Sequence, residues 1–182
     1  VGDLALRPTD AVRLEVVAGV LAPALDGPVN AVNAALLAGE RGLKVLEQKE
    51  ESRDEYTALL RVELTTGAGR RHSAAGTVAH GKPRLVAFEG FGIDFEPRGE
   101  LLLTRHRDEP GVLGQVATFL GQHGINIGGL HMGAPEAGGD APAGPGEALA
   151  LYQVSRALSD DELSALRQLP SIVVAQSLSL EG

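Results

Sequence analysis

The apolar residues between positions 101 and 132 change their spacing twice, and this feature restricts the fold more than any other. Leu101–His106 predicts a strand, residues 110–123 place apolar side chains at helical spacing, and Ile125–Met132 predicts a second strand. Pro110 suits the first helical position, because the N–H that proline lacks would have no partner there. The predicted helix has one apolar face, as a helix that covers a sheet requires. That face consists of Val112, Val116, Phe119 and Leu120.

The rest of this half continues the same pattern. Ala148–Val154 predicts a third strand, Ser159–Gln168 a second helix and Ile172–Leu180 a fourth strand. Ser159 and Glu162 have the spacing of a capping box at the start of that helix. A loop rich in Gly, Ala and Pro, residues 134–146, separates the second and third strands. The order strand–helix–strand–strand–helix–strand is that of the ferredoxin-like motif.

The N-terminal half has a different order, with two helices before its strands. Helical spacing and breaker residues predict helices at Thr9–Leu25, capped by Thr9 or Asp10, and at Asn30–Arg41. The charged run at residues 50–55 is expected to be a solvated turn. Short strands are expected at Tyr56–Thr66, Arg71–Ala79, Arg84–Phe88 and Ile93–Phe95, with turns at 67–69 and 80–83.

A turn-forming stretch at residues 96–99 marks a boundary between the two halves. The expected fold class is therefore α+β with two small domains. Residues 1–97 would pack helices on a largely antiparallel sheet, and residues 98–182 would form the ferredoxin-like domain.

The composition excludes several classes of protein. The formal net charge is −8, whereas phosphate-backbone binders usually show a basic stripe, so we expect no nucleic-acid partner. No apolar run approaches the roughly 18 residues that cross a bilayer, and no signal peptide is apparent, so we expect a cytoplasmic protein without a membrane partner. There is no Cys, which excludes disulfides and thiolate zinc sites. The sequence begins at Val1 rather than Met, so we expect it to be cut from a longer polypeptide.

The segment that joins the strand at 101–106 to the next helix contains residues suited to a small amino acid. The N–H groups of the first helical turn, around Gly111 and Val112, would attract a carboxylate together with the helix dipole. Asp108 precedes this turn and would accept hydrogen bonds from an ammonium group. Asn126, at the start of the next strand, can both donate and accept. One pocket with these groups would match a zwitterionic amino acid, but local features alone favour Asp108 and Glu109 as helix caps.

Two stretches of the sequence resemble known regulatory domains. Pro110-Gly-Val and Gly124-Ile-Asn-Ile, at their spacing, resemble the ACT domain. Pro28–Leu43, which contains Val-Asn-Ala-Val-Asn-Ala, resembles the allosteric substrate-binding domain that precedes the ACT domain in long forms of the D-3-phosphoglycerate dehydrogenase family. The resemblance extends from about Leu14 to Leu180. It implies a regulatory fragment without catalytic activity, whose parent enzyme oxidises 3-phosphoglycerate with NAD in L-serine synthesis.

The same resemblance implies an effector site and self-association. The family's serine-binding positions fall on His106, Asp108 and Asn126, next to Gly111 and Val112. In that family serine binds where two ACT domains meet side by side, which implies a homo-oligomer.

The resemblance also implies an anion site in the first domain, fed by basic side chains. Arg84 is the best match, with Lys82 and Arg71 nearby. Here the sequence departs from the family, because Gly92 and Glu96 stand where some relatives have His and Arg. A solvated basic turn is at least as good an interpretation.

Other motifs give no further site. The five histidines lack the spacing of metal ligands, so no metal is expected. No Gly-x-Gly-x-x-Gly follows a strand, so no cofactor is expected in this fragment, and NAD would bind to the parent enzyme elsewhere. Two other functions stay open: an ACT-type module that assembles oligomers without a ligand, and an amino-acid sensor of another metabolic enzyme.

Overall fold

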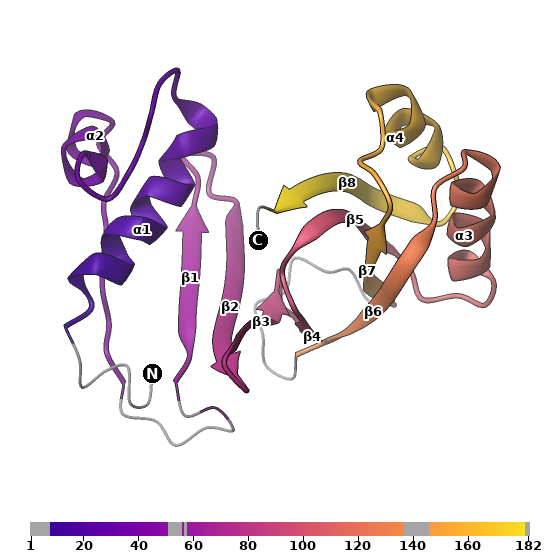
Figure 1. Cartoon of the computed structure of the whole chain (residues 1–182), viewed down its shortest axis with the longest axis horizontal. Helices are drawn as coiled ribbons and strands as arrows, with labels where there is room; N and C mark the ends of the chain where they lie inside the picture. The colour runs from indigo at the N-terminus through magenta and orange to yellow at the C-terminus, as the bar shows by residue number, and fades with distance from the viewer. Residues whose placement is uncertain (1–7, 51–55, 57, 137–145, 181–182) are drawn as a thin grey trace. The chain divides into compact units, whose positions relative to one another are not determined.

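The computed structural model describes residues 8–50, 56, 58–136 and 146–180 (Figure 1). It mixes helices and strands, as the sequence predicts. Contacts divide the chain into two compact units, Val1–Val62 and Glu63–Gly182. No helix in the described ranges is long and apolar enough to cross a membrane. Most of the predicted charged turn at 50–55 and of the predicted loop at 134–146 lies outside the described residues.

The first unit contains two helices that pack against each other. α1 (Asp10–Leu21) continues into a short 3-10 turn, η2 (Ala22–Ala24), and α2 (Ala34–Glu40) follows. Thr9 occupies the N-cap position of α1, but its hydroxyl donates to the Glu47 carboxylate instead of capping the helix. The apolar cluster between the helices consists of Val17, Ala18, Leu21, Ala34 and Ala38.

α2 begins four residues later than the predicted start at Asn30, and two asparagine side chains explain the delay. Asn30 Oδ1 accepts hydrogen bonds from the backbone N–H groups of Val32 (2.9 Å) and Asn33 (3.3 Å). Asn33 Oδ1 accepts from the Asn30 N–H (2.9 Å), and Asn33 Nδ2 donates to Pro28 O (2.9 Å). Such bonds give the backbone an alternative to helix. The Val-Asn-Ala-Val-Asn-Ala stretch therefore has a structural role as the turn that enters α2.

The second unit is built on an antiparallel sheet, in which hydrogen-bonded neighbours follow the order β1-β2-β3-β4-β6-β7-β5-β8. From β5 onward the elements have the predicted order of two helices and four strands, and all the pairings among these four strands are antiparallel. The elements are β1 (Leu60–Thr65), which begins before the division between the units, β2 (Arg71–Ala79), β3 (Lys82–Phe88), β4 (Phe91–Phe95), β5 (Gly99–Arg107), α3 (Val112–Gln122), β6 (Ile127–Pro135), β7 (Glu147–Val154), α4 (Asp160–Leu166) and β8 (Ile172–Leu180).

The two faces of strands β5–β8 are covered by different elements. α3 and α4 lie on one face (Figure 1), where Leu102 of β5 belongs to a core cluster with residues of both helices. On the opposite face, Leu101 and Leu103 pack with Phe91 and Phe95 of β4. Successive residues of β5 point to opposite faces, and both faces are buried. This explains why β5 has a continuous apolar run rather than an alternating one.

β4 connects the two parts of this sheet, which the sequence does not predict. Phe91 pairs with Pro135 and Gly92 with Ala134 of β6. A Cβ at Gly133 would lie 3.1 Å from Phe91 Cβ and 3.3 Å from Gly92 O, so glycine allows this close approach. The strands at 71–95 therefore share a compact unit with residues 98–182. The contacts divide the chain after residue 62, whereas the domain boundary at 97/98 stays a prediction.

Two turns are shorter than predicted. The turn at 80–83 is limited to His80 and Gly81, which both have positive φ, and Lys82 and Pro83 open β3. β6 extends to Pro135, beyond the expected start of the 134–146 loop, because pairing with β4 prolongs it.

Candidate functional site

Gly111 sets the start of α3. It occupies the N-cap position with φ 91°, in the left-handed region, and the helix begins at Val112. The prediction that Pro110 takes the first helical position is therefore wrong, because the left-handed residue after it breaks the helical backbone. The Gln115 amide donates to Gly111 O at 3.0 Å. The backbone N–H groups of Leu113 and Gly114, which lie between Val112 and Gln115, therefore point out of the start of the helix and have no intrahelical acceptor.

Asp108 is exposed in the turn between β5 and α3. Its amide donates to Gly146 O (2.8 Å), and the Glu109 amide donates to Arg107 O (2.9 Å), so the backbone of the turn is held in place. Glu109 accepts a hydrogen bond from Ser171 Oγ at 3.4 Å. Within the described ranges, no hydrogen bond joins the Asp108 carboxylate to an amide of α3. The carboxylate stands beside the helix start rather than capping it.

His106 is buried, with 2% of its surface exposed, on the face of β5 that the two helices cover. Its Nδ1 lies 3.2 Å from Thr104 Oγ1. Burial lowers the pKa of His106, and the Asp108 charge and the bond to Thr104 oppose this only in part. The imidazole is therefore neutral at neutral pH. The structure places this predicted site residue inside the sheet–helix interface, two residues before the exposed Asp108.

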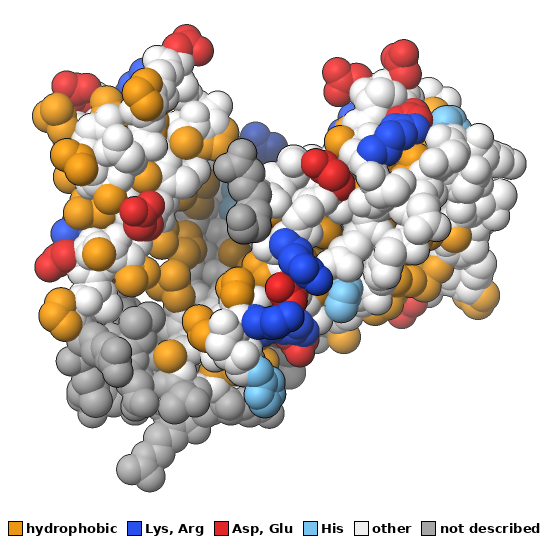
Figure 2. Space-filling view, in the orientation of Figure 1, with side chains coloured by type: hydrophobic (Ala, Val, Ile, Leu, Met, Phe, Trp, Pro, Cys, Tyr) orange, Lys and Arg blue, Asp and Glu red, His pale blue; other side chains and the backbone are white. Residues whose placement is uncertain are grey.

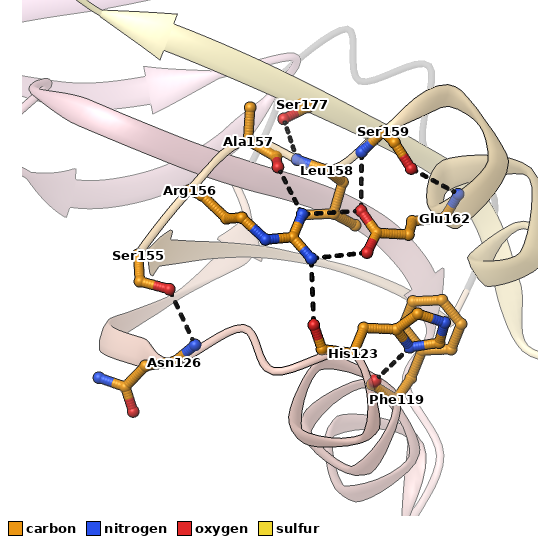
Figure 3. A network of polar contacts seen from close by, with 10 residues as sticks. All are labelled: Phe119, His123, Asn126, Ser155, Arg156, Ala157, Leu158, Ser159, Glu162 and Ser177. Atoms are coloured by element: carbon orange, nitrogen blue, oxygen red, sulfur yellow. Dashed lines mark hydrogen bonds and ion pairs between the residues drawn. The ribbon is translucent and has the colours of Figure 1, made fainter.

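Asn126 lies directly before β6, at the end of α3. Gly124 has φ 66°, and the Ile125 amide donates to Leu120 O at 2.9 Å, an arrangement that ends helices with a fixed geometry. The Asn126 amide donates to Ser155 Oγ at 3.0 Å. Its exposed side chain points away from the neighbouring polar network (Figure 3). The backbone is held, and the side-chain amide is presented to solvent.

Asp108 and Asn126 lie at opposite ends of the strands, on opposite sides of the sheet along the strand direction. β5 and β6 both run antiparallel to β7, so they point in the same direction. Arg107 pairs with Glu147 at one end of β7, and Ile127 pairs with Val154 at the other end. Seven residue steps along β7 correspond to about 24 Å. One chain therefore does not bring Asp108 and Asn126 into one pocket, contrary to the simplest form of the sequence prediction.

Arg156 is a feature of the site region that the sequence does not single out. Its guanidinium donates to both carboxylate oxygens of Glu162 (2.9 and 2.7 Å) and to the carbonyls of His123 and Ala157 (both 3.0 Å; Figure 3). Ser159 and Glu162 also form the predicted capping box of α4. Hydrogen bonds from Arg156 and then from Ser159 hold the pKa of Glu162 at about 2. The capping-box spacing is the only signal of this network in the sequence.

The basic residues of the candidate anion site have acidic partners on or next to β4. Arg84 Nε lies 2.7 Å from Asp94 Oδ1, and this hydrogen bond raises the pKa of Arg84. Lys82 Nζ lies 3.1 Å from Glu96 Oε2, and this hydrogen bond lowers the pKa of Glu96. Arg71 is the first residue of β2, whereas Arg84 pairs with a position six residues further along that strand. Six residues of a strand span about 20 Å, so Arg71 is not next to Arg84. On the coloured surface of Figure 2, Lys and Arg side chains form no continuous basic area.

Metal binding finds no support in the described part of the chain, where no group of three or more His, Cys, Asp or Glu side chains could hold an ion.

Comparison with protein families places both halves of the chain. Residues 1–89 match the D-3-phosphoglycerate dehydrogenase intervening domain, and residues 101–170 match the ACT domain. The chain belongs to the regulatory region of the D-3-phosphoglycerate dehydrogenase family. This confirms the resemblance that the sequence indicates. The ACT match contains His106, Asp108 and Asn126, and the intervening-domain match contains the candidate anion site.

Individual relatives agree with this membership. The chain is 32% identical over 179 residues to D-3-phosphoglycerate dehydrogenase of Bacillus subtilis, covering 98% of the chain and 33% of the relative. It is 28% identical over 171 residues to the enzyme of that name from Methanocaldococcus jannaschii, covering 94% and 31%. It is 38% identical over 142 residues to that of Synechocystis, covering 77% and 26%. The chain thus spans about a third or less of the length of these curated relatives.

Proposed function

We propose that this chain senses L-serine for a D-3-phosphoglycerate dehydrogenase, and that two chains associate to form each effector site. The observation that supports the proposal most is the exposed Asp108 beside the α3 helix start, whose first-turn amides have no intrahelical acceptor. This combination occurs in the part of the chain that matches the ACT domain.

The chemistry of the α3 start suits an amino acid. The serine carboxylate would accept from the free amides next to Val112, where the helix dipole favours an anion and Gly111 leaves the backbone open. The ammonium group would donate to Asp108. His106, neutral and buried behind Asp108, would support the turn and contribute a nitrogen to the site.

Asn126 would complete this site from a second chain. Within one chain, the strand ends next to Asp108 and Asn126 are about 24 Å apart along β7. Two ACT parts that lie side by side would be related by a two-fold axis. In such an interface the two surfaces run in opposite directions, so Asn126 of one chain would lie near Asp108 of the other. The Asn126 amide would then donate to and accept from the effector.

The outer edge of β6 supports this mode of association. Among the residues that the structure describes, β4 pairs with Ala134 and Pro135 at the end of β6. Earlier in the strand, Leu130 and Met132 are 42% and 44% exposed. An exposed strand edge with half-exposed apolar side chains is a ready site for pairing with another chain.

The architecture and the parent enzyme belong to the same proposal. The ACT part, residues 98–182, would be a ferredoxin-like domain, preceded by the intervening domain at residues 1–97. The fragment itself would have no catalytic activity. The parent enzyme would oxidise 3-phosphoglycerate with NAD in the cytoplasm, as the first step of L-serine synthesis, and serine would regulate it by binding two states with different affinity.

A candidate anion site at Arg84 and Lys82 is the weaker part of the proposal, because an anion would have to displace Asp94 and Glu96. Isothermal calorimetry with phosphate and 3-phosphoglycerate tests it. If Arg84→Ala leaves the affinity for both unchanged, this site is excluded.

Calorimetry with a panel of amino acids tests the effector. We expect heat with serine that is lost in Asp108→Ala and in Asn126→Ala, because each substitution removes one polar contact of the ligand. Sedimentation of the same variants should show that the chains still associate. Heat with another amino acid alone would assign a different effector. No heat with any amino acid, in a chain that still associates, would leave oligomer assembly as the function.

A further inference from the structure

We propose that Arg156 is a positioning residue for Asn126: it fixes the end of α3 against the start of α4 and so determines where the Asn126 side chain stands. The inference rests on the proposed function, because it concerns the same effector site. It adds a residue that does not contact the effector but controls one that does.

The first support is the set of groups that Arg156 joins. His123 is the C-cap residue of α3, and its carbonyl belongs to the last turn, where helix carbonyls have no intrahelical partner. Arg156 Nη2 donates to this carbonyl at 3.0 Å and to Glu162 Oε1 at 2.7 Å (Figure 3). Glu162 is in the first turn of α4 and is held there by the capping box with Ser159. One guanidinium therefore links the end of one helix to the start of the next.

The second support is the neighbouring residue, Ser155. The Asn126 amide donates to Ser155 Oγ, and the Ser155 amide donates to Asn126 O, both at 3.0 Å. Two consecutive residues, Ser155 and Arg156, thus hold the backbone at positions 126 and 123. These contacts use backbone groups of Asn126 and leave its side chain to the solvent. Such an arrangement fixes the base of a side chain while leaving its amide available for a ligand.

The third support is the geometry of the ion pair. An arginine that donates to both oxygens of a carboxylate has a fixed plane, which a lysine ammonium cannot reproduce. Glu162 is 14% exposed in its side chain, and its pKa of about 2 keeps it ionised across the physiological range. The paired Glu162 therefore also sets the direction of the second N–H of Arg156 Nη2, which donates to His123 O.

The test compares two arginines that hold opposite ends of α4. Arg167 Nε and Nη2 donate to Ala175 O at 3.0 and 2.7 Å and join the end of α4 to β8. Arg167→Ala is thus a matched control, because it removes a similar anchor from the opposite end of the same helix, where the arginine donates to Ala175 O and not to the segment at 123–126. Serine affinity is measured by calorimetry well below the unfolding temperature of each variant. Amide hydrogen exchange at Ile125 and Asn126 is measured without serine.

We expect Arg156→Ala to weaken serine binding about tenfold and to accelerate exchange at both amides, whereas Arg167→Ala leaves both quantities near the unmodified values. Arg156→Lys should give an intermediate affinity, and Glu162→Gln, which keeps a capping side chain, should resemble it. Equal loss of affinity in Arg156→Ala and Arg167→Ala, or no loss in Arg156→Ala, would overturn the positioning role. If the unmodified chain binds no amino acid, the proposed function itself fails, and the two failures are thereby distinguished.

Discussion

At the scale of single residues, the sequence indicates which polar side chains lie near the start of α3 but not how deeply they lie. His106 lies three positions after the apolar run Leu101–Leu103, and strand alternation places it on the same face as Leu102. Its burial depends on α3 and α4, which cover that face. The role of Arg156 depends on a carbonyl 33 residues away in the sequence, so no local pattern announces it.

The buried His106 gives a prediction about pH. Because burial lowers the pKa of His106 below 6.5 in the folded chain, the unfolded chain binds a proton first as the pH falls. The free energy of unfolding should therefore decrease as the pH falls below about 6.5 and level off below the folded-state pKa. Urea unfolding at pH 7.5 and 5.5 measures the change. In His106→Asn, which keeps a polar atom near Thr104 Oγ1, the decrease should become smaller. An equal decrease in this variant would exclude His106 as its source.

At the scale of elements, the first residue of a helix can be predicted when a known capping motif of local hydrogen bonds determines it. The Ser159–Glu162 capping box predicts the start of α4, because both partners are three residues apart. The starts of α2 and α3 differ from the predictions for two reasons. The reciprocal bonds of Asn30 and Asn33 delay α2, and the left-handed Gly111 excludes Pro110 from α3.

Gly111 and Gly114 provide a matched pair of substitutions at the start of α3. Gly111→Ala should lower the free energy of unfolding by about 1–2 kcal/mol, because φ 91° is unfavourable for a residue with a Cβ. Gly114→Ala, inside the helix and with open space around its Cβ, should raise it by up to about 1 kcal/mol. Chemical denaturation of both variants measures the two effects. A stabilising Gly111→Ala would mean that the helix begins elsewhere in solution.

At the scale of the whole molecule, pairings between distant segments escape prediction. The order of elements from β5 to β8 follows from apolar spacing and breaker residues. The close approach of β4 and β6 depends on Gly133, where a Cβ would lie 3.1 Å from Phe91 Cβ, and it joins residues more than 40 positions apart in the sequence. No periodicity encodes such a contact. The sequence therefore indicates the elements of the second unit but not the strand that connects its two parts.

The opposite positions of Asp108 and Asn126 in one chain lead to a prediction about mixed oligomers. If each site takes Asp108 from one chain and Asn126 from another, Asp108→Ala and Asn126→Ala chains alone should each bind no serine. In a dimer that contains one chain of each kind, one site keeps both residues and the other keeps neither. Random exchange between equal amounts of the two variants should restore roughly a quarter of the unmodified serine sites. Calorimetry before and after exchange measures this recovery. Sites contained in single chains would show no recovery, because every chain would still lack one of the two residues.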